Sequence, residues 1–293
     1  MALRLAIANL KGGVGKSTTT LFLSEALAVF HDLRVLVIDL DPQSNTSFML
    51  LSRDGLESAE GQGRTLPHFL LDLENAKKTP PSLQAYICGQ ASDLTELKAG
   101  GKRGRVDLLP SVPRLWFVES LFEKRYYMQD VDPGAELRLT LSRYLDPLDA
   151  WYDLIIFDCP PGVSALTRAG ILGADVIISP TIADAVSLRS LSDFVDIGLG
   201  QVLQIKKSLP HFVIISKYQA NATDQLEVDR LKKRHDVLDP PIPLTKAMTK
   251  ATERPRFDAY RSFKETYGKL EADVRLLTDR VYRYAIVKHG GKS

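Results

Sequence analysis

A glycine-rich segment between an apolar run and a helical pattern constrains the fold of this chain most strongly. The segment is Lys11-Gly12-Gly13-Val14-Gly15-Lys16-Ser17-Thr18, and it follows the apolar run Leu3–Ala8. Glycines let backbone N–H groups turn inward around phosphate oxygens, and the start of the following helix adds partial positive charge. Lys16 would then reach the β- and γ-phosphates of a nucleotide, and the Ser17 hydroxyl would bind Mg²⁺. The segment therefore predicts a phosphate-binding loop between a strand and a helix.

Short apolar runs alternate with longer helical patterns along the chain. Because most of these runs are almost wholly apolar, we expect strands that are buried on both faces of a sheet. The alternation predicts a doubly wound α/β fold of the P-loop NTPase type, with a mostly parallel sheet, helices on both faces and a single domain over residues 1–293. The expected strands are Leu3–Ala8, Val35–Asp39, Val106–Leu109, Leu154–Asp158, Val176–Ser179, Phe212–Ser216 and, as a further candidate, Ile242–Leu244.

Two segments depart from this alternation. Residues 52–105 contain glycine-rich and proline-rich stretches, so we expect an irregular surface excursion with short helices such as Leu66–Glu74. Residues 258–288 have apolar side chains at a 3–4 spacing that predicts a long C-terminal helix. This helix either packs on the sheet or binds a partner, and Gly268 in its middle weakens a free-standing coiled coil.

Composition excludes several classes of protein. Of the 293 residues, 44% are hydrophobic and 25% charged, which is not typical of disordered or fibrous chains. No run reaches the roughly 18 uncharged apolar residues of a membrane-spanning helix, and two cysteines cannot form a disulfide framework. We therefore expect a cytoplasmic protein.

The net charge of +2 hides an uneven distribution. Residues 1–200 carry a net charge of −6 and residues 201–293 a net charge of +8. The basic excess raises the question of a polyanionic partner for the last third of the chain.

Carboxylates follow two of the expected strands. Asp39 and Asp41 end the second strand at positions i and i+2, so both can face the same side of an extended chain. Asp158 ends the strand Leu154–Asp158 in the arrangement of a Walker B carboxylate, which would hold Mg²⁺. Ligands in such sheets bind at the carboxyl ends of the strands, where Lys16 is also expected. The alternative for either Asp39 or Asp41 is that it only caps the next helix.

These motifs resemble those of one family. The strict pattern GxxxxGK[ST] fails because Leu10 replaces its first glycine, but the loop fits the deviant Walker A form KGGxGK[ST]. It is similar to the loop of the ParA/MinD family of P-loop ATPases, and the DxDPQ and DCPPG segments resemble the two switches of ParA/Soj-type partitioning proteins.

The resemblance implies a role for each matching residue. Lys11 would reach across a dimer interface to the nucleotide of the other subunit, as an additional catalytic cation beside Lys16. Asp41 would position the attacking water, Asp158 would hold Mg²⁺, and Asp39 would support the metal shell or the loop. Lys217 and Pro243 fall where the family contacts the adenine base.

The basic C-terminal region adds an expected DNA surface. In ParA proteins basic residues of this region bind DNA without sequence preference when ATP pairs two subunits; the alternative is an ordinary solvated face. The residues that match are Lys246, Lys250, Arg254, Arg256, Arg261 and Lys264.

The resemblance thus predicts a ParA-type partitioning ATPase with weak intrinsic activity. ATP and Mg²⁺ would be its cofactors, ATP would form a homodimer on nucleoid DNA, and a ParB-like or other partner would stimulate hydrolysis and release. The alternatives are a MinD-like membrane-positioning ATPase and a metabolic or transport ATPase. We expect no membrane attachment, because the C-terminus lacks a wide apolar helical face.

Overall fold

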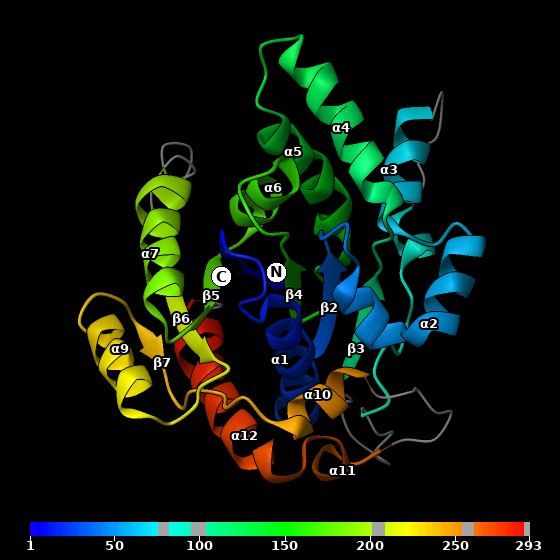
Figure 1. The fold of residues 1–293 in the computed structure, drawn as a ribbon. Coiled ribbons are helices and arrows are strands. Elements are labelled where there is room, and N and C mark those ends of the chain that lie inside the picture. The colour runs from blue at the N-terminus through cyan, green and yellow to red at the C-terminus, as the bar shows by residue number, and fades with distance from the viewer. Residues whose placement is uncertain (76–81, 95–103, 201–208, 254–260, 290–293) are drawn as a thin grey trace.

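The computed structural model describes residues 1–75, 82–94, 104–200, 209–253 and 261–289. Seven strands form one sheet in the order β3-β2-β4-β1-β5-β6-β7, and every pair of neighbouring strands is parallel (Figure 1). This is the single α/β domain that the sequence predicts. The strands are β1 Leu3–Ile7, β2 Arg34–Asp39, β3 Arg105–Leu109, β4 Leu154–Asp158, β5 Val176–Ile182, β6 His211–Ser216 and β7 Val237–Leu238.

Helices cover both faces of the sheet because successive strand residues point to opposite sides. Leu36 and Ile38 of β2 pack in one core with α3, α4, α5, α6 and α7, whereas Val35 and Val37 pack in the other with α1 and α12. The helices are α1 Lys16–His31, α2 Asn45–Gly61, α3 Leu66–Asn75, α4 Arg114–Tyr127, α5 Pro133–Leu145, α6 Ala165–Gly173, α7 Ala185–Asp193, α9 Ala222–Lys232, α10 Lys246–Glu253, α11 Phe263–Tyr267 and α12 Glu271–Arg280.

The seventh strand differs from the expected one. It is Val237–Leu238, and not Ile242–Leu244, where only Pro243 makes an isolated bridge to Tyr218. Three prolines at positions 240, 241 and 243 explain the difference, because proline has no N–H to donate to a ladder. The sequence 240–244 therefore forms a loop beside the end of β6, and this loop contributes to the site described below.

The C-terminal segment is not the one continuous helix that the spacing predicts. It breaks at Gly268, whose φ of +56° ends α11, and a short 3₁₀ turn leads into α12. A π-helical stretch, Val281–Val287, continues from α12. The buried side chains Tyr267, Val274 and Leu277 belong to the core around α1, so this segment packs on the sheet layer as the first alternative predicts.

The segment 52–105 is more regular than expected where the structure describes it. Helix α2 continues to Gly61, with a kink at Ser52 where φ is +62°, and α3 covers the expected short helix. Residues 76–81 and 95–103 of this segment lie outside the described ranges. Within those ranges, no helix is long and apolar enough to cross a membrane.

Candidate functional site

The glycine-rich segment forms a tight loop between β1 and α1. Gly13 and Gly15 have φ of +74° and +88°, a region that side-chain-bearing residues rarely adopt. A Cβ on Gly15 would also lie 3.3 Å from Ser216 Oγ. These two positions therefore need glycine, and α1 starts directly after them at Lys16 with its N-terminus at the loop.

The end of β6 holds this loop in place. Ser216 Oγ donates to the Val14 carbonyl at 2.7 Å, and Lys217 Nζ donates to the Gly13 carbonyl at 2.8 Å. Asn9 supports the loop from its other side, because its side chain donates to the Pro180 carbonyl at 2.8 Å and accepts from the Lys11 amide at 3.2 Å. Asn9 is fully buried. The only sequence signal for its role in supporting the loop was its place between the apolar run Leu3–Ala8 and the glycine-rich segment.

A cleft of about 480 Å³ opens over the loop at the carboxyl ends of the strands. Its walls come from the loop, from the start of α2, from Pro161 and from the end of α10. The predicted residues that the structure brings together in it are Gly12, Gly13, Gly15, Lys16, Ser17, Thr18, Asp41 and Lys217. Such an arrangement has the size and the backbone donors to hold a triphosphate.

A smaller cavity of about 110 Å³ adjoins this cleft and shares Gly15, Thr18, Lys217 and Thr252 with it. Lys217 and Pro243, the expected base contacts, both line the smaller cavity. Helix α10 adds Met248, Thr249 and Thr252, which no sequence motif marks as site residues. The spacing of these three residues places them on one helical face, but it does not indicate that this face meets the loop.

Asp158 lies fully buried beneath the loop. Its carboxylate accepts hydrogen bonds from Thr20 Oγ1 at 3.1 Å and from Thr46 Oγ1. Burial raises the pKa of Asp158 to about 6, although hydrogen bonds from the Thr46 and Ser17 hydroxyls oppose that rise. The Ser17 hydroxyl and the Asp158 carboxylate are thus neighbours, and they supply the hard oxygen ligands that Mg²⁺ prefers, directly or through water.

Lys16 shares this environment. Its ammonium donates to the Lys11 carbonyl at 3.2 Å, and burial lowers its pKa while the charges of Asp158 and Asp41 oppose the shift. A triphosphate in the cleft would supply further negative charge beside this lysine, which favours the charged form.

The two carboxylates after β2 have different surroundings. Asp41 lines the cleft and is 6% exposed, and its Oδ1 accepts from the Gln43 amide at 2.8 Å. Asp39 is fully buried; its Oδ2 accepts from the amide of Ser47 at 2.9 Å and from the hydroxyl of Ser47 at 2.6 Å, in the first turn of α2. The contacts of Asp39 are those of the helix-capping alternative.

Lys11 points away from the cleft. Its ammonium donates to Ser187 Oγ at 2.8 Å and lies 3.7 Å from Asp184 Oδ1, at the start of α7. Among the described residues, the second lysine of the loop is therefore held by its own subunit, on a helix that starts beside the carboxyl end of β5.

The three lysines of the basic C-terminal set lie on two helices that contact each other. Lys246 and Lys250 are exposed on α10, Lys264 is exposed on α11, and Arg261 precedes α11 with its amide donating to the Asp93 carbonyl. Arg254 and Arg256 lie outside the described residues.

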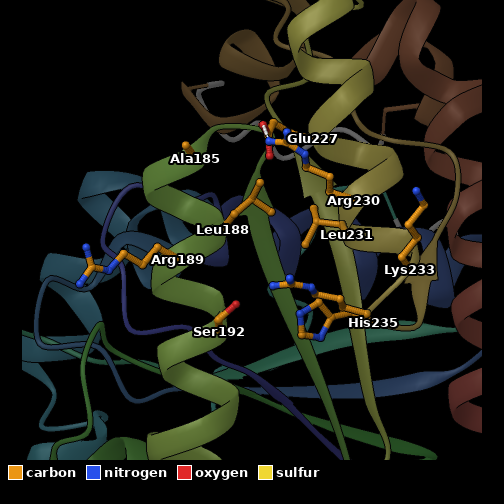
Figure 2. Close-up of a pocket in the computed structure, with 10 residues that line it drawn as sticks. Ala185, Leu188, Arg189, Ser192, Glu227, Arg230, Leu231, Lys233 and His235 are labelled. Carbon is orange, nitrogen blue, oxygen red and sulfur yellow. Dashed lines mark hydrogen bonds and ion pairs between the residues drawn. The ribbon is translucent and has the colours of Figure 1, made fainter.

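A second cleft, of about 570 Å³, lies between α7 and α9 (Figure 2). Leu188 and Leu231 face each other across it, whereas Arg189 points away from it and Arg230 pairs with Glu227 at 2.6 Å. This cleft is lined by neither the loop nor its carboxylates, so it is separate from the candidate nucleotide site.

Comparisons with known proteins agree with this geometry. A family model described as an AAA domain matches residues 3–212. Chromosome partitioning protein ParA from Myxococcus xanthus is 29% identical over 208 residues, which are 69% of this chain and 62% of that protein. The matched region spans about three fifths of the length of such curated relatives.

Solved structures show the same fold. A plasmid partition protein from Borrelia burgdorferi has a TM-score of 0.66 at 20% identity, covering 97% of this chain and 99% of that one. A cobyrinic acid a,c-diamide synthase from Mycobacterium smegmatis, with bound ATP analog and magnesium, has a TM-score of 0.66 at 24% identity, covering 97% and 96%. Since the family model covers most of the chain and the curated relatives include Soj and ParA proteins, this chain belongs to the ParA/Soj family of P-loop ATPases.

Proposed function

We propose that this protein is a partitioning ATPase, in which ATP pairs two subunits, the pair binds DNA without sequence preference, and a partner protein stimulates hydrolysis and release. The observation that carries the proposal is the cleft that holds the phosphate loop with its buried lysine together with Asp41. Its cargo would be a chromosome, a plasmid or a protein assembly.

The loop and the carboxylates have separate roles in this proposal. Backbone N–H groups of the loop and the Lys16 ammonium bind the phosphates, and Asp41 orients the attacking water from the wall of the cleft. Ser17 and Asp158 hold Mg²⁺, which neutralises charge that develops on the phosphates. Buried Asp158 is suited to this because its ionised form needs a compensating cation nearby.

Lys11 joins the two subunits in this proposal. To reach the nucleotide of a partner subunit, its ammonium has to leave Ser187 and Asp184 at the start of α7. A cation supplied in trans stabilises the charge of the transition state, as an arginine finger does. Hydrolysis then removes the group that holds the lysine and lets the subunits separate.

Dimer formation also explains how a chain with a net charge of only +2 can bind DNA. Each subunit carries its basic excess after residue 200, and α10 places Lys246 and Lys250 in solvent. Pairing two such surfaces doubles the number of phosphate contacts, so DNA affinity follows the nucleotide state and falls steeply with salt.

The two alternative functions predict different binding partners and substrates. A MinD-like protein would bind lipid vesicles, and a metabolic ATPase like the synthase of similar fold would turn over ATP with a small-molecule substrate and no DNA. Within the described residues, no cluster of three or more His, Cys, Asp or Glu side chains could hold a metal ion, as a cluster carrier would need.

The proposal is tested by DNA retention in the presence of AMPPNP, ATP or ADP. We expect retention with ATP and AMPPNP but not with ADP, and loss of retention in Lys16→Ala. The double variant Lys246→Ala/Lys250→Ala should bind nucleotide normally but lose DNA affinity, with the slope of log affinity against log salt lower by about 3 to 4, since a dimer then lacks four cations.

Lys124→Ala is the matched control, because Lys124 is equally exposed but lies on α4, in the opposite layer. Equal DNA binding in all nucleotide states would contradict the proposal. Sedimentation with anionic vesicles instead of DNA would support the MinD-like alternative.

A further inference from the structure

The Walker B carboxylate is held from two helices. Asp158 Oδ1 accepts from Thr20 Oγ1 of α1 at 3.1 Å, and Asp158 Oδ2 accepts from Thr46 Oγ1 of α2. All three side chains are fully buried. Each oxygen of the carboxylate therefore accepts from one buried threonine. The remaining lone pairs are available to the Ser17 hydroxyl and to a cation or its water.

Thr46 lies in the first turn of α2, which is hydrogen-bonded to residues at or just after the carboxyl ends of β2, β3 and β4. The next residue, Ser47, donates to Asp39 Oδ2 at 2.6 Å, and its hydroxyl accepts from the Ser111 amide at 2.8 Å. Asp39 and Asp158 are register partners on β2 and β4. The first turn of α2 is therefore hydrogen-bonded to both carboxylates at neighbouring strand ends, and in the described part of the chain Thr46 is the residue of this turn that bonds Asp158.

The same turn forms a wall of the nucleotide cleft. Asn45, Phe48 and Met49 line the cleft and occupy positions i, i+3 and i+4, which share one helical face. Thr46 points from an adjacent face to the buried carboxylate. The Thr46 hydroxyl therefore joins the buried carboxylate directly to the turn that forms this wall of the cleft.

If Thr46 served only to pack against its neighbours, its hydroxyl would not be needed. Valine has the same shape as threonine, and it avoids the cost of burying a polar group. The hydroxyl is stabilising here because it donates to a buried carboxylate, and such partners fix the orientation of groups that bind metals.

We propose that Thr46 is a positioning residue, which orients Asp158 toward Mg²⁺ and couples the metal site to the start of α2. The inference rests on the proposed binding of ATP and Mg²⁺ in the cleft. Thr20 also orients the carboxylate, but it does so from α1 and not from α2. This difference between the two threonines makes the coupling testable.

The experiment measures the affinity of a fluorescent methylanthraniloyl derivative of AMPPNP against Mg²⁺ concentration in Thr46→Val, Thr46→Ser and Thr20→Val. We expect Thr46→Val to need about tenfold more Mg²⁺ for half of the affinity gain, the lower end of what loss of such a partner costs. The nucleotide affinity of Thr46→Val without Mg²⁺ should stay within about twofold of that of the unmodified protein, since the phosphate loop is intact. Thr46→Ser should restore the Mg²⁺ dependence.

Hydrogen exchange of the α2 amides distinguishes the effect of Thr46→Val from that of Thr20→Val. We expect faster exchange over residues 47–50 in Thr46→Val, and unchanged exchange there in Thr20→Val. Ser24→Ala is the control for loss of a buried hydroxyl, because the Ser24 hydroxyl donates to the Leu21 carbonyl within α1 and, among the described residues, makes no bond to Asp158 or α2.

Each outcome has a defined meaning. Unchanged Mg²⁺ dependence in Thr46→Val overturns the inference, and so does a Thr46→Ser variant as weak as Thr46→Val. Equal α2 exchange in both valine variants overturns the coupling to α2. If the unmodified protein does not bind the nucleotide at all, the proposed function itself fails.

Discussion

The ammonium of Lys11 donates a hydrogen bond of 2.8 Å to Ser187 Oγ, within its own subunit. This contact keeps the ammonium of the second lysine of the loop at the start of α7, whereas Lys16 lines the cleft. A dimer that uses Lys11 in trans has to break the contact, so its strength opposes dimerisation.

Ser187→Ala should therefore strengthen dimerisation that depends on ATP. A hydrogen bond to a charged group contributes about 1.5 to 3 kcal/mol, and the lower value, which suits this partly exposed contact, corresponds to roughly a tenfold change for each lysine released. The α7 cap survives, because Asp184 still accepts from the backbone amide of residue 187. Analytical ultracentrifugation with AMPPNP measures the dimer constant.

Two controls accompany that measurement. Ser192→Ala removes a hydroxyl elsewhere on α7 and should dimerise like the original protein. Lys11→Ala should bind nucleotide but lose turnover. A Ser187→Ala variant with an unchanged dimer constant would show that the tether does not limit dimerisation.

Asp41→Asn should retain nucleotide binding and dimerisation while losing ATP turnover by at least about 100-fold, the usual scale for removing a group that acts on the attacking water. Asparagine keeps an oxygen that can accept from the Gln43 amide. The measurement is phosphate release beside the dimer constant, with Asp54→Asn, an exposed carboxylate of α2, as the control. Normal turnover in Asp41→Asn would remove Asp41 from this role.

The site could be predicted from the sequence where its residues are adjacent in the chain. The segment 11–18 specifies its own turn through Gly13 and Gly15, and the apolar run before Asp158 specifies a buried strand end. Both predictions concern local backbone geometry, and the structure brings both segments to the same edge of the sheet.

The contributions of α10 and Asn9 could not be predicted in this way. Met248, Thr249 and Thr252 reach the cavity only because the proline-rich loop 240–244 returns the chain past the end of β6. Gly268 breaks the C-terminal helix although the apolar spacing continues through it, because burial against α1 is satisfied on both sides of the break. Such features depend on packing between segments that are distant in the sequence, and the apolar periodicity of one segment does not indicate that packing.

Thr252→Leu should test the role of α10 in nucleotide binding. Thr252 lines both cavities, so a larger apolar side chain there reduces the space for a base. We expect ATP affinity to fall by about tenfold, the scale of an overpacked contact worth 1 to 3 kcal/mol. Thr252→Ser should bind normally. Titration calorimetry measures both, and equal affinity in Thr252→Leu would place the base elsewhere.

The stability of the fold should depend on His211 below neutral pH. Burial, with the nearby charge of His235, lowers the pKa of His211 to about 4, while its ring nitrogen Nε2 pairs with Ser179 Oγ at 2.8 Å. The unfolded chain takes up a proton near pH 6.5, and the folded chain does so only near pH 4. The free energy of unfolding therefore falls as the pH decreases from about 6.5 to about 4, and His211 accounts for up to about 3 kcal/mol of this loss.

His211→Gln keeps a nitrogen near Nε2 but cannot titrate. Urea unfolding of both proteins between pH 4 and pH 8 should give a stability difference that is constant above about pH 6.5 and shifts in favour of His211→Gln below it. A pH-independent difference would show that His211 does not titrate in this range.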